Sequence, residues 1–131
     1  MAENGGNMEL LNEWQTRLGL QEWRIKLQTD CKESEMRKKG SSGCVEWTEC
    51  NKTAAIEIMS KEEYGDRITE WNLEETLVHE LLHLKFSLLD DNAWNDEAFM
   101  PDRYIHQLVD DMARALICAK RNILKINIKE D

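Results

Sequence analysis

The sequence is poor in residues that break or cross-link a chain. It has one proline, six glycines and four cysteines among 131 residues. So little proline argues against extended disorder, and no two cysteines form the CxxC pair of structural zinc knuckles. Cys44 and Cys50 could face each other on neighbouring strands, but a chain of this length can bury a core without disulfides. We expect a single domain over 1–131 with reduced thiols.

Long apolar runs and an excess of positive charge are also missing. Apolar residues make up 41% of the chain, and no run of them approaches the length of a membrane span. Lys and Arg total 17 against 26 Asp and Glu, which gives a formal net charge of −9. Nucleic acid and anionic membranes are therefore not expected as partners. The start, Met1 to Gly6, has neither a basic nor an apolar stretch, so we expect no signal peptide and a cytoplasmic protein.

The spacing of the apolar residues predicts an α+β domain. After a frayed start at 1–7, apolar residues recur at helical spacing over 8–18, and Gly19 suits the end of that helix. Three segments then alternate apolar and polar residues as strands do: 22–28, 44–50 and 53–59. The sequence thus predicts an N-terminal helix followed by a small three-stranded sheet.

Polar stretches separate these elements and are expected to be connections. Residues 32–43 include Arg37-Lys38-Lys39 and two glycines, so we expect a mobile, solvated loop, at the tip of a long hairpin between the first two strands. Asn51-Lys52 suits a two-residue turn between the second and third strands. Residues 61–70 should be a polar connection to the next helix.

The clearest helix is expected from about Leu73 to Leu89. Asn72 is a suitable N-cap, and Glu75 completes a pattern typical of a capping box. Apolar residues occupy almost the whole circumference of this helix, so it should cross the middle of the domain. The acidic segment 90–102 should follow as a surface loop.

A last long helix is expected from Arg103 to about Arg121, beginning after Pro101-Asp102. Its apolar residues recur at helical spacing: Ile105, Val109, Met112, Ala113 and Leu116. The tail 122–131 alternates apolar with polar residues and could be a short strand or a loose amphipathic end. The core of the domain would therefore span 8–121.

The buried helix contains the sequence His79-Glu80-Leu81-Leu82-His83. Two histidines four positions apart lie on one face of a helix, so both imidazoles can reach one cation. Glu80 lies at the edge of that face, where it can take a proton from a metal-activated water without being a ligand. Without a metal, a glutamate and two imidazoles would be buried in an apolar helix at considerable cost. This HExxH pattern predicts a zinc site with Glu80 as the general base of a hydrolysis.

Zinc in a hydrolase needs a third protein ligand besides the two histidines of the motif. The remaining histidine, His106, lies on the last helix, 23 residues after His83. We expect it to complete the site, with three carboxylates as rivals: Glu97, Asp102 and Asp110. Asp110 could instead orient His106 through the free nitrogen of its ring.

The order of the elements resembles that of a known family. Helix, three strands, HExxH helix, acidic loop and second helix look like the minimal gluzincin-type zinc metallopeptidases, the minigluzincins and related small phage or prokaryotic domains. The resemblance covers roughly 8–121, and its specific part is T-L-V-H-E-L-L-H at 76–83. His106 stands where those families often have a glutamate ligand, and Asp110 matches their aspartate position. Metzincins need a histidine at the position of Leu89 and do not fit.

The resemblance implies a zincin-like fold, a zinc cofactor and hydrolysis of a peptide or protein substrate. It also implies that strand 53–59 lies along the cleft and pairs with extended substrate. The tail 122–131 is apolar enough to lie in such a cleft as an added strand and hold the enzyme latent.

Three points stay open at the level of sequence. Tyr64, Arg103 and Tyr104 are candidates for the group that stabilises the oxyanion. The protein could instead be a metal-binding regulatory or phage-encoded interaction protein with little turnover. It could also be a zinc hydrolase that acts on a non-peptide amide.

Overall fold

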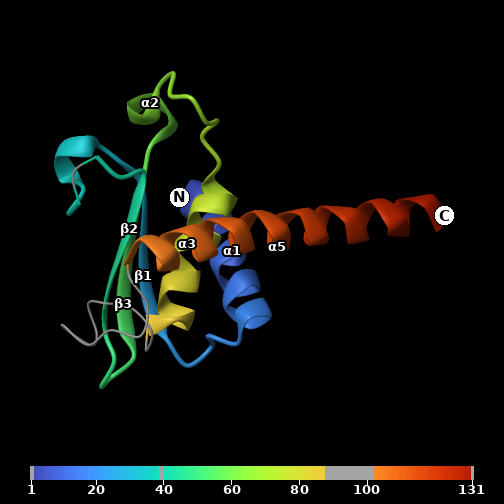
Figure 1. The fold of residues 1–131 in the computed structure, drawn as a ribbon, viewed down its shortest axis with the longest axis horizontal. Coiled ribbons are helices and arrows are strands. Elements are labelled where there is room, and N and C mark those ends of the chain that lie inside the picture. Colours follow the sequence, from blue (N-terminus) through green and yellow to red (C-terminus); the bar gives the residue numbers. More distant parts are fainter. Residues whose placement is uncertain (1, 39, 88–101, 131) are drawn as a thin grey trace.

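The structure is a computed structural model that describes residues 2–38, 40–87 and 102–130, with side chains described over 6–38, 40–87 and 104–122 (Figure 1). Its elements are α1 (Ala2–Leu18), β1 (Arg24–Cys31), η1 (Glu33–Glu35), β2 (Gly43–Thr48), β3 (Thr53–Met59), α2 (Lys61–Tyr64), α3 (Leu73–Lys85) and α5 (Asp102–Glu130). Helices and a small mixed sheet together confirm the α+β class. The loop expected at 90–102 lies outside the described residues, except that Asp102 begins α5.

The sheet has the strand order β1-β3-β2, with β3 in the centre. β1 runs parallel to β3, whereas β2 runs antiparallel to it and places Thr48 opposite Thr53. Asn51-Lys52 therefore lies in the predicted turn, although this turn comprises 49–52, with Lys52 at a φ of 52°. The prediction of a long hairpin around 32–43 is wrong, because β1 and β2 are not neighbours in the sheet. This stretch contains η1 and carries the chain from one side of β3 to the other.

The helices α1, α3 and α5 lie on one side of the sheet, and α5 crosses α3 (Figure 1). The alternation in β3 turns Ala54, Ile56 and Ile58 toward the helices, as predicted, because a strand repeats its side-chain direction every second residue. These residues form one core with buried residues of the three helices, including Leu11, Trp14, Leu77, Val78, Leu81, Ile105, Val109 and Ala113. Burial of this apolar surface is the main stabilising contribution to the fold.

The helix α3 begins where the sequence predicts. The Asn72 side chain accepts a hydrogen bond from the backbone N–H of Glu75 at 3.0 Å, which caps the first turn. The helix is buried on most of its surface, Glu80 and His83 included. It ends at Lys85, before the predicted Leu89, because Phe86 leaves the helical conformation, with φ −103° and ψ 21°.

The helices at the two ends of the chain are longer than predicted. α1 begins at Ala2, so the prediction of a frayed start at 1–7 is wrong. Gly19, with a φ of 70°, ends the helix as expected. α5 continues to Glu130, so a strand at 122–131 is also wrong. Residues 122–130 contain neither glycine nor proline, so nothing in them ends a helix that has already formed. The tail therefore does not lie in a cleft as an added strand, and Figure 1 shows α5 running away from the sheet.

Polar contacts join the three helices where α5 leaves the core. The ammonium of Lys120 on α5 contacts the carboxylates of Glu13 on α1 and Glu74 on α3. The indole N–H of Trp14 donates to Glu74 at 2.7 Å, which satisfies a buried donor. None of the helices in the described part of the chain is both long and apolar enough to cross a membrane.

All four cysteines are free thiols in the structure. Cys44 is buried in β2, and its Sγ lies 3.2 Å from Oε1 of Glu57 on the neighbouring strand. Cys50 is exposed in the turn between β2 and β3. The pairing of Cys44 with Cys50 that neighbouring strands would allow is therefore not formed.

Candidate metal centre

The three histidines of the chain meet between α3 and α5. His79 and His83 come from successive turns of α3, and His106 comes from the start of α5. One ligand atom from each lies within 4.8 Å of the others. The Nε2 atoms of His79 and His83 are 3.3 Å apart, and the rings of His83 and His106 have centroids 4.8 Å apart. These residues lie close enough to hold one metal ion, as the sequence predicted.

The hydrophobic core explains why His106 reaches this site. Ile105 and Val109, on the same helix, are fully buried against α3. They lie one residue before and three residues after His106, so they fix the rotation of α5 about its axis. The imidazole is therefore directed toward α3 by the packing of α5.

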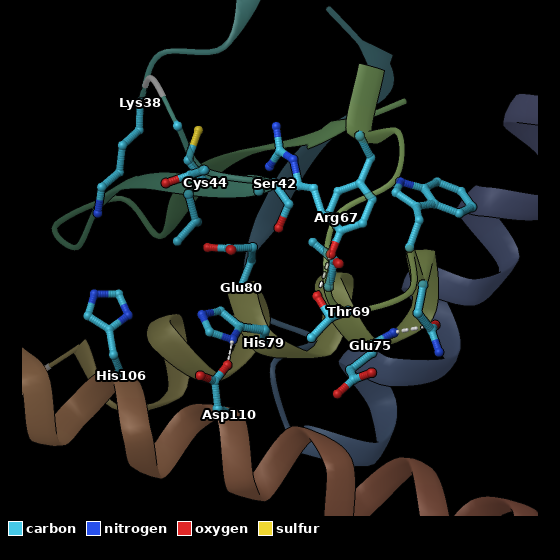
Figure 2. A pocket seen from close by; sticks show the side chains of 18 of the residues that line it. Lys38, Ser42, Cys44, Arg67, Thr69, Glu75, His79, Glu80, His106 and Asp110 are labelled. Carbon is cyan, nitrogen blue, oxygen red and sulfur yellow. Dashed lines mark hydrogen bonds and ion pairs between the residues drawn. The ribbon is translucent and has the colours of Figure 1, made fainter. Parts of the chain in front are cut away.

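Asp110 supports the centre, but through a different histidine than predicted. The Nδ1 of His79 donates to its carboxylate at 2.7 Å (Figure 2). The sequence suggested His106 as the partner, because both residues lie on one face of α5. The crossing of the two helices instead places His79 opposite Asp110. This bond leaves Nε2 of His79 free to point at His83, which is the arrangement of carboxylate-supported metal ligands.

Burial keeps the histidines of α3 in the form that binds a metal. It lowers the pKa of His83 to about 3, with smaller effects in the same direction from the charges of the other two histidines. Burial also lowers the pKa of His79, against the opposing effect of Asp110. A lowered pKa means that both imidazoles are neutral at pH 7, and a histidine must be neutral to ligate a cation. The donor set therefore fits a bound metal ion.

Glu80 lies beside the three histidines without joining them. Only 6% of its surface is exposed, and burial raises the pKa of its carboxyl to about 8, although the charge of Lys38 acts in the opposite direction. Its side chain points from α3 toward β2 (Figure 2). A buried acid with a raised pKa at the edge of a histidine cluster can hold or transfer a proton near neutral pH.

The other carboxylates proposed as ligands do not compete within the described residues. Glu97 and the side chain of Asp102 lie outside them. Asp110 is engaged with His79 and is not in the group that could hold the ion. Of the two candidates whose side chains the structure describes, His106 is therefore in the group that could hold an ion and Asp110 is not.

A cavity of about 1110 Å³ opens above the histidines and Glu80. The floor is formed by α3 and α5, and the walls by Lys38, residues 40–45 and Trp47 on one side and by Tyr64 and residues 66–72 on the other. Figure 2 shows Lys38, Ser42 and Cys44 on the wall opposite His79 and His106. A concave site of this size accommodates a peptide segment or a ligand of similar size.

The strand beside this cavity is β2 and not β3. The resemblance implied that 53–59 pairs with substrate, but β3 is the central strand and its backbone is bonded to strands on both sides. Four residues of β2 line the cavity: Gly43, Cys44, Val45 and Trp47. Among the strands that the structure describes, β2 has a neighbour on one edge only. Residues 54–59 carry apolar side chains on both faces of the strand. This pattern is visible in the sequence and is typical of a strand with neighbours on both sides.

The three residues predicted as candidates for oxyanion stabilisation differ in their position relative to the cavity. Tyr64 lines the cavity, but its hydroxyl is hydrogen-bonded to the hydroxyl of Thr69. Tyr104 is exposed and is not among the residues that line the cavity. The side chain of Arg103 lies outside the described residues. The basic loop that was expected to be only solvated does contribute to the cavity, through Lys38.

Comparisons of the chain with family models, with curated proteins and with solved structures find no significant match. What the site can do is therefore inferred from its own residues and their geometry.

Proposed function

We propose that the protein is a zinc-dependent peptidase in which His79, His83 and His106 hold the metal and Glu80 is the general base. The observation that carries the proposal is the buried Glu80 beside three converging imidazoles at the floor of an open cavity. Three protein ligands with one coordination position left for water are typical of catalytic zinc, whereas structural zinc usually has four. The proposed family remains the minigluzincin-like metallopeptidases.

Each residue of the site has a role in this proposal. Zinc, when bound, would act as a Lewis acid and lower the pKa of the water in its open position. Glu80 would accept the proton that this water loses as its oxygen adds to the peptide carbonyl carbon. It would then deliver the proton to the leaving nitrogen as the C–N bond breaks. Asp110 would keep the Nε2 of His79 directed at the metal.

The edge of β2 supports a peptide as the substrate. A strand edge presents unpaired N–H and C=O groups, and an extended peptide can satisfy them by pairing as a further strand. Gly43, Cys44 and Val45 of β2 line the cavity that holds His79 and Glu80. A peptide paired along this edge would carry its carbonyl groups past the histidines. A small non-peptide amide would leave most of this surface unused.

The test compares the wild-type chain with Glu80→Gln and with Glu9→Gln as a control. Glu9 is exposed on α1 and is not among the residues that line the cavity. We expect all three proteins to bind about one zinc ion per chain. Cleavage of a denatured-protein library should fall about 10²–10⁴-fold in Glu80→Gln, because the base is lost. Glu9→Gln should cleave as the wild type does.

Three results would contradict parts of the proposal. Wild-type turnover in Glu80→Gln would show that Glu80 is not the base. Loss of zinc from this variant would make Glu80 a ligand. A zinc-loaded wild-type protein that cleaves nothing in the library would favour the metal-binding regulatory protein over the peptidase.

A further inference from the structure

One lysine lines the cavity on the wall opposite the histidine cluster (Figure 2). Lys38 lies between η1 and β2 and lines the same cavity as the three histidines and Glu80. In Figure 2 its side chain descends from the loop toward the side of the cavity that holds His106 and Glu80. Burial has the largest effect on the pKa values of Glu80 and His83, but the positive charge of Lys38 also acts on both, which places it near the HExxH motif.

Buried contacts fix the backbone on the N-terminal side of Lys38. Met36 is 2% exposed in a small core, and the N–H of Arg37 donates to Oε1 of Glu57 at 3.0 Å. Glu57 is itself buried on the central strand, and the Arg37 guanidinium pairs with it and with Glu46. The chain therefore enters the position of Lys38 from an anchored segment and not from a freely solvated loop.

The other cations of the cavity are already engaged. Arg114 pairs with Glu75 and Asp111, and the Arg67 guanidinium lies over the ring of Tyr64, 4.9 Å from its centre. No ion pair holds Lys38 among the residues that the structure describes. Its ammonium is therefore the cavity cation that is available to a ligand at the metal centre.

We propose that Lys38 is the catalytic residue that stabilises the oxyanion, an inference that rests on the proposed peptidase function. When the water oxygen bonds to the carbonyl carbon, the π electrons of the C=O bond move to the carbonyl oxygen, and the proton of the water goes to Glu80. The Lys38 ammonium donates a hydrogen bond to this negative oxygen and keeps its own protons. When the C=O bond forms again, the C–N bond breaks, and the nitrogen takes the proton from Glu80.

Turnover of three variants tests this role in the zinc-loaded, full-length protein. Lys38→Met removes the charge, Lys38→Arg retains it, and Lys26→Met removes the same charge from an exposed position on β1 outside the cavity. We expect kcat of Lys38→Met to fall about 10²–10³-fold at every pH, with KM and zinc content little changed. Lys38→Arg should recover part of this loss, and Lys26→Met should match the wild type.

Anion binding gives a second readout that does not depend on turnover. The cobalt-substituted proteins are titrated with inorganic phosphate, whose tetrahedral oxygens resemble the negative centre, and the visible spectrum of cobalt reports binding. Phosphate should bind Lys38→Met at least about 10-fold more weakly than wild type or Lys26→Met, because a charge-assisted hydrogen bond is lost.

The outcomes separate this inference from the proposed function. If the wild type cleaves peptides and Lys38→Met keeps its kcat and its phosphate affinity, the role of Lys38 is wrong and the peptidase stands. The pH profile of kcat in Lys38→Met gives a further test. If its acid limb is shifted but its maximum is unchanged, the proposed role is also wrong, since Lys38 would then act only through the pKa of Glu80. If the wild type cleaves nothing, the peptidase fails, and unchanged phosphate affinity in Lys38→Met would overturn the role of Lys38 independently.

Discussion

His106 and Asp110 lie one turn apart on α5, yet they contact the centre in different ways. The ring of His106 belongs to the group whose ligand atoms converge, whereas the carboxylate of Asp110 accepts a hydrogen bond from Nδ1 of His79. A ligand contributes directly to metal binding, while a residue behind a ligand only orients it. The two residues should therefore differ strongly in what their loss costs.

Zinc affinity should reveal this difference. We expect Asp110→Ala to weaken zinc binding about 10–100-fold, the usual cost of a lost supporting carboxylate. His106→Ala should weaken it far more, because only two ligands remain. Competition with a chelator measures both, and Gln107→Ala, which changes an exposed residue between them, is the control. If Asp110→Ala loses the metal and His106→Ala retains it, the two assignments must be exchanged.

The residues of the site differ in how far the sequence could predict them. His79, Glu80 and His83 follow from helical spacing alone, and His106 from the scarcity of histidine. The partner of Asp110 could not be predicted, because it depends on how α5 crosses α3. Lys38 could not be predicted either, because contacts with a strand 20 residues away anchor the segment before it.

At the scale of elements, β2 begins in very close contact with α3. A side chain at Gly43 would place its Cβ 2.7 Å from Cγ2 of Thr76 and 3.0 Å from Oε2 of Glu80. Both distances are shorter than ordinary van der Waals contact. The absence of a side chain at position 43 therefore lets the strand approach the helix directly at Glu80.

Gly43→Ala should disturb both stability and turnover. We expect the free energy of unfolding to fall by about 1–3 kcal/mol, because the added methyl group overpacks the contact between β2 and α3. Turnover should also fall, since Glu80 must move, while zinc content is retained. Denaturant unfolding and kcat measure the two effects.

Two further variants test the cause of this effect. Gly6→Ala adds a methyl group where no atom lies within 4 Å, so it should not destabilise the protein. Thr76→Ser removes the methyl group that position 43 would meet, so adding it to Gly43→Ala should restore part of the stability. A Gly43→Ala protein as stable and active as the wild type would show that the contact yields without cost.

The sequence predicted where strands lie better than how they pair. Alternation identifies a strand and its buried face, as it does for Ala54, Ile56 and Ile58. It carries no information on neighbours, so the parallel pairing of β1 with β3 was missed. The extent of α5 was missed for a different reason: the alternating residues of 122–130 suit a strand locally, but the helix before them continues without a residue that ends it.

At the scale of the whole molecule, the centre joins elements that are distant in sequence. His79 and His83 belong to α3, His106 belongs to α5, and 22 residues separate His83 from His106. An ion held by all three would tie the two helices together. Binding to the folded state alone then adds directly to its stability.

Removal of the metal should therefore lower the melting temperature. At a free zinc concentration 100 times Kd, binding adds about 2.7 kcal/mol to the folded state. For a domain of this size that corresponds to a difference of about 10 °C between zinc-loaded and chelator-treated protein. Calorimetry measures it, and His106→Ala should show a much smaller difference. An unchanged melting temperature at saturating zinc would show that the folded protein does not bind the ion.

The length of α5 has a consequence for motion at the centre. His106 and Asp110 lie near its start, and the helix continues to Glu130, about 36 Å beyond His106 at 1.5 Å per residue. A tilt of about 5° at the histidine end would move the other end by about 3 Å. A small rotation of α5 about its histidine end thus becomes a displacement of more than a bond length near Glu130.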